Sequence, residues 1–418
     1  MRTLFDTTII CGPLAAVLAL LALTACGGGG GGADEQVVDT DTTAVTTSYA
    51  TLAKEAADSP VGIAAAAAPP SASDPVGIGI LPPAVLAYCR QTDDWSQCGD
   101  KTVIRAEVSG QTREFIVWRP KTAAQRAKVP VVFMLHGTSG DGEKFWNISG
   151  WREKALREGF YAVFPSALKH CFEQDETRDN VVNPTVHVVT KWADGQLGTS
   201  ERPLCGPAQI AALTGAQRNG LALTLADDVA FARTMVAEMQ TRFPRTDAKR
   251  LFVTGFSNGA AMVGRLAAQM SDVFAAAHCA SSVVPTQVSD VVVASRPISI
   301  LHSMGDEDEE QKPALGYEVG TIPLTESLMQ NPRYRLGVVA PFLNVLQKTD
   351  PYVYASTLVS GVQTSSFTYA TNARANGGNN FFRTTLIQGA THEYPNGRNH
   401  PVIMANELWP FFSANPLP

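Results

Sequence analysis

The chain has 418 residues, a formal net charge of −6 at pH 7 and 17% charged residues, a balance that excludes a dominant basic surface and argues against nucleic acid as a partner. Hydrophobic residues make up 45% of the chain, which is enough for a large core and excludes wholesale disorder. A polytopic membrane protein is excluded as well, because only the extreme N-terminus holds an apolar run near membrane-spanning length.

The first 25 residues have the features of an export signal. Arg2 supplies a weak positive charge, an apolar stretch follows at 9–23, and small residues precede the expected cleavage point. The sequence Leu-Thr-Ala-Cys at positions 23–26 resembles the lipobox of bacterial lipoproteins, whose cysteine is lipidated. We therefore expect Cys26 to anchor the exported protein at the bacterial outer membrane or cell surface. An ordinary cleaved signal, with release outside the cell, is the alternative.

A flexible tether is expected over residues 26–84. Gly27–Gly32 is an unbroken glycine run that cannot pack, and the following residues are rich in Ala, Thr and Pro. Length alone allows two or three domains at about 150 residues each. Once the signal and the tether are set aside, we expect one folded domain over 85–418. The net charge stays at −6 without residues 1–25, which hold one Arg and one Asp.

From residue 102 onward the sequence alternates strands and helices. Strands at 102–108 and 113–118 form a hairpin, and the apolar run 129–135 predicts a strand buried on both faces. Further elements are expected as helix 151–158, strand 161–164, helix 229–242 with Asp227 or Asp228 as its N-cap, strand 251–254, helix 258–270, strands 274–279, 297–301, 367–369 and 381–387, and a closing helix 401–412 interrupted near Pro410.

This alternation predicts an α/β fold with a doubly wound, mostly parallel sheet. Two extra stretches, 169–224 and 307–363, are expected as loop-rich insertions around the site. Ligands of such sheets bind at the carboxyl ends of the strands, so catalytic residues are sought there.

Five of the seven cysteines remain once Cys11 goes with the signal and Cys26 with the lipid. In an oxidising compartment we expect a local disulfide and a second one across the first insertion, with one thiol left free in an apolar run. A zinc site is the disfavoured alternative, because no two cysteines are spaced C-x-x-C. The expected pairs are Cys89 with Cys98 and Cys171 with Cys205, and the free thiol is Cys279.

A G-x-S-x-G motif stands between the strand 251–254 and the helix 258–270, with Ser257 at its centre. A serine on a tight strand-to-helix turn projects its hydroxyl above the sheet, and small residues two positions away leave room for close neighbours. The helix N-terminus also directs N–H groups toward a developing anion. The motif therefore predicts a nucleophile at Ser257, against the alternative of a glycine-rich packing turn.

A nucleophilic serine needs a base and an orienting acid, which follow it in the order acid then histidine in this kind of fold. His392 is the expected base because it lies in a loop directly after the strand 381–387. His400 is a second candidate, and His302 is expected to be structural because it precedes the acid.

Asp306 is the expected acid, as the first carboxylate after the strand 297–301, and it follows a glycine that lets the chain turn. Asp308 is the runner-up. A solvated acidic loop over 306–310 is the alternative interpretation of this run of charge.

The oxyanion hole needs two N–H donors. One is expected from Asn258, the residue after the nucleophile, and the other from Thr138 or Gly137 in the loop after the strand 129–135. That loop lacks the Gly-Lys-Ser/Thr of a phosphate-binding loop, and His392 lacks the partner histidine of a zinc protease. The chemistry therefore requires no metal and no organic cofactor.

Five aromatic residues are candidates to line an acyl or aromatic pocket, with core packing as the alternative for each. The first insertion, 169–224, is expected to form a lid or rim that carries one of them, because long structureless loops are often functional. The five residues are Phe145, Trp146, Trp192, Phe256 and Tyr394.

Together, Leu-His-Gly at 135–137, Asp-Asp-Val-Ala-Phe at 227–231 and the serine motif with its trailing Ala-Met at 255–262 resemble the poly(3-hydroxybutyrate) depolymerase and feruloyl esterase branch of the α/β-hydrolases. The resemblance covers about 102–412. It departs from the branch in the acid loop, where Ser-Met stands at 303–304, and in the base loop around His392.

The resemblance implies a serine esterase that acts through an acyl-enzyme on polyhydroxyalkanoate or other polyester oligomers, or on feruloyl-type esters. The expected substrate of this chain is thus an ester, either small or polymeric. Two alternatives stay open at this point: a non-catalytic binding lipoprotein on a hydrolase scaffold, and a peptidase or acyltransferase that uses the same three residues.

Overall fold

The structure is a computed structural model, and it describes residues 83–92, 94–175, 184–371 and 380–418. The chain divides into two units, Met1–Thr43 and Ala44–Pro418, and all described residues belong to the second. The expected signal at 1–25, the lipidation site Cys26 and the tether up to residue 82 lie outside the described residues.

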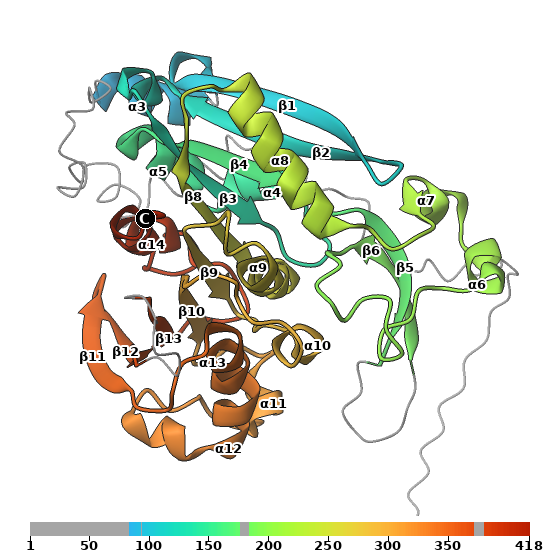
Figure 1. Cartoon of the computed structure of the whole chain (residues 1–418), viewed down its shortest axis with the longest axis vertical. Coiled ribbons are helices and arrows are strands. Elements are labelled where there is room, and N and C mark those ends of the chain that lie inside the picture. The colour runs from blue at the N-terminus through green and yellow to red at the C-terminus, as the bar shows by residue number, and fades with distance from the viewer. Residues whose placement is uncertain (1–82, 93, 176–183, 372–379) are drawn as a thin grey trace, which may run out of the picture. The chain divides into compact units, whose positions relative to one another are not determined.

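One large sheet forms the centre of the described part of the chain (Figure 1). In spatial order its strands are β1 (Gly99–Val108), β2 (Gln111–Pro120), β4 (Tyr161–Pro165), β3 (Val129–Leu135), β8 (Thr246–Phe256), β9 (Ala276–Ala280), β10 (Ser299–Gly305), β13 (Phe382–Ile387), β12 (Val362–Tyr369) and β11 (Val353–Val359). Strands β4 to β13 in this order run parallel, and antiparallel strands flank them on both sides. This confirms the predicted α/β fold.

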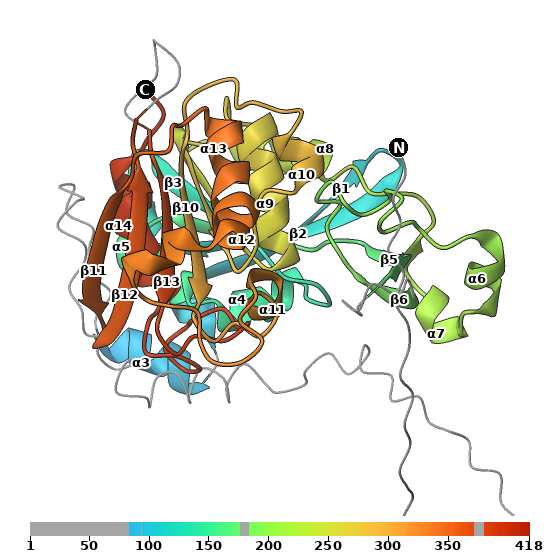
Figure 2. The same cartoon turned by 90° about the horizontal axis from the view of Figure 1, so that it is seen from below.

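Helices cover both faces of the large sheet (Figures 1 and 2). The alternation of side chains along β3 shows why: Val131 and Phe133 enter one apolar core, and Val132 and Met134 enter the other. The first core contains residues of α8 (Asp228–Arg242), α9 (Asn258–Gln269) and α13 (Ala340–Leu346), and the second contains residues of α4 (Gly142–Ile148), α5 (Trp151–Glu158) and α14 (Met404–Ala414).

The first insertion is not the structureless loop that the sequence predicts. It contains a small sheet with the order β6 (Thr185–Thr190), β5 (Lys169–Gln174) and β7 (Leu221–Ala222). Two short helices follow β6, at α6 (Pro207–Ala212) and α7 (Gly215–Arg218). The disulfide Cys171–Cys205 joins β5 to the segment before α6. A small core of its own, with Val188 and Leu213, packs around this disulfide.

Short elements complete the described chain. The helices are α3 (Pro83–Thr92), α10 (Thr286–Ser289), α11 (Lys312–Leu315) and α12 (Pro332–Tyr334), with 3-10 turns at η1 (Trp95–Gln97), η2 (Lys121–Gln125) and η3 (Glu326–Gln330) and a π-helical turn at η4 (Arg335–Val339). In this part of the chain, no helix combines the length and the hydropathy that crossing a membrane would need.

Two boundary differences have physical causes. Helix α14 continues through Pro410 to Ala414 instead of breaking there, because Trp409 and Phe412, on either side of the proline, are both buried in the core. Strand β10 continues to Gly305, four residues beyond the expected end at Leu301, because it pairs with β13 along that whole length. The second difference moves the start of the acid loop.

The cysteine expectations are confirmed. Cys89 pairs with Cys98, Cys171 pairs with Cys205, and Cys279 is a buried free thiol on β9. Burial raises the pKa of the Cys279 thiol, so this residue behaves as a small apolar side chain and not as a nucleophile.

Candidate active site

Ser257 occupies a strained turn between β8 and α9. Its backbone has φ 51° and ψ −124°, a conformation that costs a residue with a side chain on the order of 1–3 kcal/mol. The sheet holds it there, since the Ser257 N–H donates to the carbonyl of Ala280 on β9 at 2.9 Å. The motif's glycines are needed for close approach: a Cβ on Gly255 would lie 2.4 Å from the carbonyl oxygen of Gly259, and one on Gly259 would lie 2.2 Å from that of His136.

A chain of hydrogen bonds leads away from the Ser257 hydroxyl. The Oγ of Ser257 lies 2.9 Å from Nε2 of His392, and Nδ1 of His392 lies 2.9 Å from Oδ1 of Asp308. Asp308 is fully buried, whereas Ser257 and His392 are partly exposed. The Asp308 carboxylate also accepts from the backbone N–H groups of Glu310 and Gln311, both at 3.1 Å, which fix it toward the ring.

The expected acid, Asp306, does not face His392. Its carboxylate accepts from the Gly389 N–H at 2.6 Å, while its own N–H still pairs with the Ile387 carbonyl of β13 at 3.2 Å. Asp306 therefore belongs to the strand end, and it ties the loop that carries His392 to β10. Gly305 serves the same contact, because a Cβ there would lie 1.8 Å from the carbonyl oxygen of Ala390.

The charges around His392 favour its protonated form. Burial by itself would lower the pKa of His392, but the hydrogen bond to Asp308 and the negative charges of Asp308, Glu310 and Glu309 outweigh burial and raise the pKa above its usual value. Glu309 also accepts from the His392 backbone N–H at 2.9 Å. The run of acidic residues is thus more than a solvated loop.

The other histidines of this region are held in structural contacts. His302 is buried on β10 with Nδ1 2.9 Å from the Thr384 hydroxyl, and burial lowers its pKa to about 3. His400 has Nε2 2.9 Å from the Gln388 carbonyl oxygen. Neither histidine contacts Ser257, which leaves His392 as the ring beside the serine.

Two of the three expected oxyanion residues, Asn258 and Gly137, lie next to Ser257. Asn258 is the first residue of α9, and a Cβ on Gly137 would lie 3.3 Å from the Cβ of Ser257. The Asn258 side chain is used elsewhere: its Oδ1 accepts from the Trp192 N–H at 2.7 Å, and its Nδ2 donates to Asp194 at 3.0 Å. The residue after the serine therefore clamps the first insertion to the start of α9.

The first insertion also braces the loop 136–140. The Ser139 N–H donates to the Thr190 carbonyl at 2.9 Å, and the Thr190 hydroxyl donates to the Gly140 carbonyl at 2.6 Å. The indole of Trp192 donates to the His136 carbonyl at 2.8 Å. The segment 190–194 thus joins the loop after β3 to the helix after the serine.

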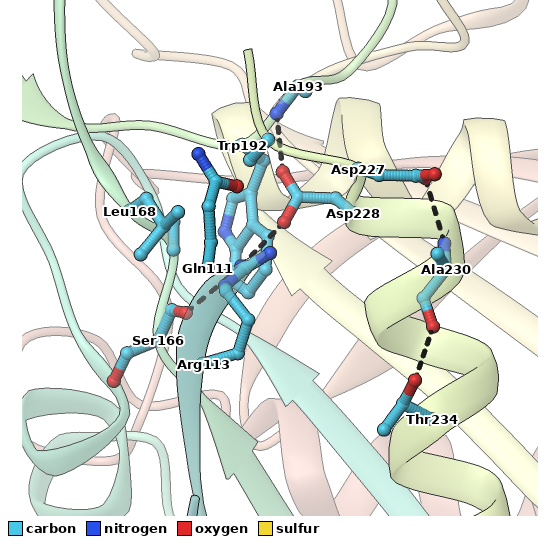
Figure 3. A network of polar contacts seen from close by, with 12 residues as sticks. Gln111, Arg113, Ser166, Leu168, Trp192, Ala193, Asp227, Asp228, Ala230 and Thr234 are labelled. Atoms are coloured by element: carbon cyan, nitrogen blue, oxygen red, sulfur yellow. Dashed lines mark hydrogen bonds and ion pairs between the residues drawn. The ribbon is translucent and has the colours of Figure 1, made fainter. Parts of the chain in front are cut away.

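Sequence reasoning missed the buried ion pair that anchors this segment (Figure 3). Arg113 on β2 donates to Asp228 at 2.6 Å, with both side chains fully buried, and the other Asp228 oxygen accepts from the Ala193 N–H at 2.7 Å. The preceding Asp227 is the N-cap of α8 and accepts from the Ala230 N–H at 2.9 Å. Two consecutive aspartates, where one is enough to cap a helix, are the signal that could have revealed the pair.

The aromatic candidates separate into two groups. Phe256 lies beside the base, with ring centroids 5.1 Å from His392, 6.3 Å from Phe145 and 6.2 Å from Tyr394. Phe256 is half-buried, and the other two aromatic rings are buried behind it. Phe256 is therefore the one of these three rings that faces the site beside His392, and the two buried rings support it.

Trp146 and Trp192 do not line the site. Trp146 is buried between Trp118, at 6.2 Å between ring centroids, and the Arg152 guanidinium, at 4.0 Å from its ring. Trp192 is 1% exposed and packs 5.0 Å from the His136 ring, so it anchors the insertion and does not sit on a lid. In the described ranges, no group of three or more His, Cys, Asp or Glu residues could hold a metal ion.

The chain is similar to known protein families over much of its length. A model of the prolyl oligopeptidase family matches residues 224–415, and a model of the dienelactone hydrolase family matches residues 116–315. Feruloyl esterase B of Piromyces equi is 30% identical over 156 residues, a match that covers 35% of this chain and 28% of the relative. The chain thus matches less than a third of that relative's length.

Solved structures with a similar fold include two esterases or hydrolases. An acetyl xylan esterase from Aspergillus awamori is 14% identical, with 74% of this chain and 99% of that chain covered and a TM-score of 0.43. An S-formylglutathione hydrolase from Agrobacterium tumefaciens is 14% identical, with 76% and 95% covered and a TM-score of 0.43.

The two family models overlap over residues 224–315, the part of the chain that holds the Ser257 turn and the loop with Asp308. Both models describe hydrolase families. Together with the parallel order of the central sheet, they place the chain in the α/β-hydrolase superfamily, where it is similar to serine hydrolases and esterases.

Proposed function

We propose that this protein is a serine esterase that hydrolyses carboxylic esters through an acyl-enzyme. The observation that carries the proposal is the hydrogen-bonded chain from Ser257 through His392 to Asp308, in which both contacts are 2.9 Å. A nucleophile, a base and an orienting acid in that geometry are what acyl transfer requires.

Each group has one role in the proposed reaction. The Ser257 Oγ attacks the ester carbonyl while Nε2 of His392 accepts its proton, and Asp308 holds the ring and stabilises the imidazolium. The tetrahedral oxyanion is bound by the backbone N–H of Asn258 and by that of Thr138 or Gly137. The leaving alcohol takes the proton from His392, and water then releases the acid by the same route.

The proposed substrates are polyhydroxyalkanoate or other polyester oligomers, or feruloyl-type aryl esters. Three observations support this class: the sequence resemblance, the name of the feruloyl esterase relative, and the half-buried ring of Phe256 beside the base, which Phe145 and Tyr394 support from the core. The exposed part of the Phe256 ring would pack against an apolar or aromatic acyl group. Peptide or acceptor-alcohol chemistry, and binding without turnover, are the outcomes that a substrate test must separate from ester hydrolysis.

Removal of the nucleophile tests the reaction itself. Ser257→Ala should lower kcat on a short acyl ester by roughly five to six orders of magnitude, because only the oxyanion hole and binding remain. The wild type should be labelled stoichiometrically by a fluorophosphonate probe, and Ser257→Ala should not be labelled.

Ser281→Ala is the matched control, since Ser281 also has a positive φ but is not part of the chain of contacts to His392. It should keep both turnover and labelling. Normal turnover by Ser257→Ala would refute the assignment, and an unlabelled wild type would favour the binding protein. A panel of hydroxybutyrate oligomers, feruloyl esters, aryl esters, polyethylene terephthalate and peptides then identifies the substrate class.

The two aspartates should respond differently to the same substitution. Asp308→Asn should lower kcat by roughly 10³–10⁴-fold, because the amide favours the wrong tautomer of His392. Asp306→Asn should change kcat by less than about tenfold and should lower the free energy of unfolding by about 1–2 kcal/mol, because it weakens the bond from Gly389. Kinetics and denaturant unfolding of both variants measure the contrast, and equal losses of kcat would reject Asp308 as the acid.

The acidic loop should set the lower limb of the pH profile. His392 must be neutral to accept a proton, so kcat/KM should rise through the raised pKa of His392, at a pH above the usual value for histidine. Glu310→Gln and Glu309→Gln each remove a charge that raises this pKa, so both should move the limb to lower pH.

Glu307→Gln is the control, because Glu307 is exposed on the same loop but is not among the charges that raise the pKa of His392. Profiles of kcat/KM from pH 5 to 8 at low ionic strength make the comparison, since added salt screens exposed charges. A limb that stays in place in both variants would show that the loop does not tune the base.

We also propose that Cys26 is lipidated and holds the enzyme at the bacterial outer membrane, where polymeric substrates are met. Cys26→Ala should move the protein from the membrane fraction to the soluble fraction and abolish incorporation of labelled palmitate. Cys11→Ala, inside the expected signal, should change neither result. Retention of Cys26→Ala in the membrane fraction would count against the anchor.

A further inference from the structure

Lys191 is a buried cation beside the loop proposed to bind the oxyanion. The residue follows β6, and its side chain is only 5% exposed. Its ammonium donates to the Thr138 hydroxyl at 3.3 Å and lies 5.2 Å from the centre of the Phe172 ring. Thr138 itself is exposed, and the residue before it, Gly137, lies against Ser257. Lys191 is thus a buried cation in contact with the loop next to the nucleophile.

Burial and the charged neighbours of Lys191 together make its protonated form less stable than that of an exposed lysine. Burial is the main influence and lowers its pKa to about 8; Arg202 lowers the pKa as well, and Asp194 partly offsets both effects. The Asp194 carboxylate is already used by the Asn258 side chain at 3.0 Å and by the Gln196 N–H at 3.0 Å. The Lys191 ammonium is therefore buried, and its main carboxylate neighbour is already occupied by other hydrogen bonds, so little offsets the cost of its desolvation.

Holding the loop in shape does not require this cation. Thr190 makes two hydrogen bonds to residues 139 and 140, and the Trp192 indole binds the His136 carbonyl. These contacts lie on both sides of Lys191 and involve neutral groups only. A neutral side chain at position 191 would leave these hydrogen bonds intact. The structural role of the loop therefore does not account for a buried ammonium at this position.

We propose that Lys191 is a positioning residue of the oxyanion hole, whose ammonium orients Thr138 and places a positive charge behind the site where the carbonyl oxygen becomes negative. Lys191 acts through Thr138 and does not touch the substrate. A fixed charge in a site of low dielectric stabilises a developing oxyanion strongly and needs no reorganisation during the reaction. The inference rests on the proposed esterase activity of this same site.

The proposal predicts an upper limb in the pH profile, because a neutral Lys191 no longer provides the charge. The wild type should lose kcat as the pH rises through about 8, the pKa of Lys191. Lys191→Met should lower kcat at pH 7 by on the order of tenfold with little change in KM, and its profile should stay flat up to pH 9.5. Lys191→Arg should keep kcat near that of the wild type at pH 7 and should not lose it up to pH 9.5, because a guanidinium remains charged.

Lys169→Met on β5 controls for the loss of a lysine from the same insertion and should behave as the wild type. If Lys191→Met keeps the upper limb of the wild type, or loses the same activity at every pH, Lys191 has only a structural role and the proposal is wrong. If Lys191→Met does not fold, as judged by circular dichroism, the Lys191→Arg profile still decides: an upper limb unchanged from the wild type rejects the proposal.

Failure of the proposed function has a different signature. The reaction of Ser257 with a fluorophosphonate also develops negative charge on an oxygen in the oxyanion hole. The rate of labelling should therefore vary with pH as ester turnover does, and the Lys191 variants should change both in the same way. A wild type that neither hydrolyses esters nor reacts with the probe refutes the esterase and this inference together. A wild type that does both, with an upper limb independent of Lys191, refutes the inference alone.

Discussion

The backbone of Ser257 is the constraint on which the rest of the site depends. A residue with a side chain is held at φ 51°, and this conformation persists because β8, β9 and α9 fix it from three directions. The glycines of the motif let α9 approach so closely that the carbonyls of Leu135 and His136 lie where a Cβ on Gly259 would be. That contact brings the end of β3 against the serine turn. Hence the turn that exposes the nucleophile also sets the place of the loop with Gly137 and Thr138.

The first insertion, which lies between β3 and Ser257 in the sequence, completes this arrangement. Arg113 and Asp228 form a pair that is fully buried, and further hydrogen bonds help to offset the cost of removing such charges from water. Here the second oxygen of Asp228 binds the Ala193 N–H, so part of that offset comes from the insertion itself (Figure 3). Asn258 binds the same segment. The insertion is therefore a fixed part of the site, and its disulfide, Cys171–Cys205, closes a module that has a small core of its own.

Local patterns predicted the parts of the molecule that local physics determines. The apolar run of β3, the helix α5, the Ser257 turn and the histidine loop all follow from spacing within a short stretch of chain. The acid could not be chosen this way. Asp306 and Asp308 are both acidic and close to a strand end, and the choice depends on how far β10 pairs with β13 and on where the Ala390 carbonyl lies. The small sheet, the anchoring role of Trp192 and the Arg113–Asp228 pair likewise depend on partners far away in sequence.

The distribution of charge matches the movement of charge in the proposed reaction. When the Ser257 proton passes to His392, the ring becomes positive, and Asp308, Glu309 and Glu310 lie where they stabilise that state. At the same moment the carbonyl oxygen becomes negative beside the loop of Thr138, where Lys191 supplies a positive charge that Asp194 offsets in part. Acidic groups thus surround the base and a buried cation contacts the oxyanion loop, an arrangement that favours the separated charges of the tetrahedral intermediate over the neutral ester. A net charge of −6 says nothing of this, because the site depends on where a few charges stand and not on their sum.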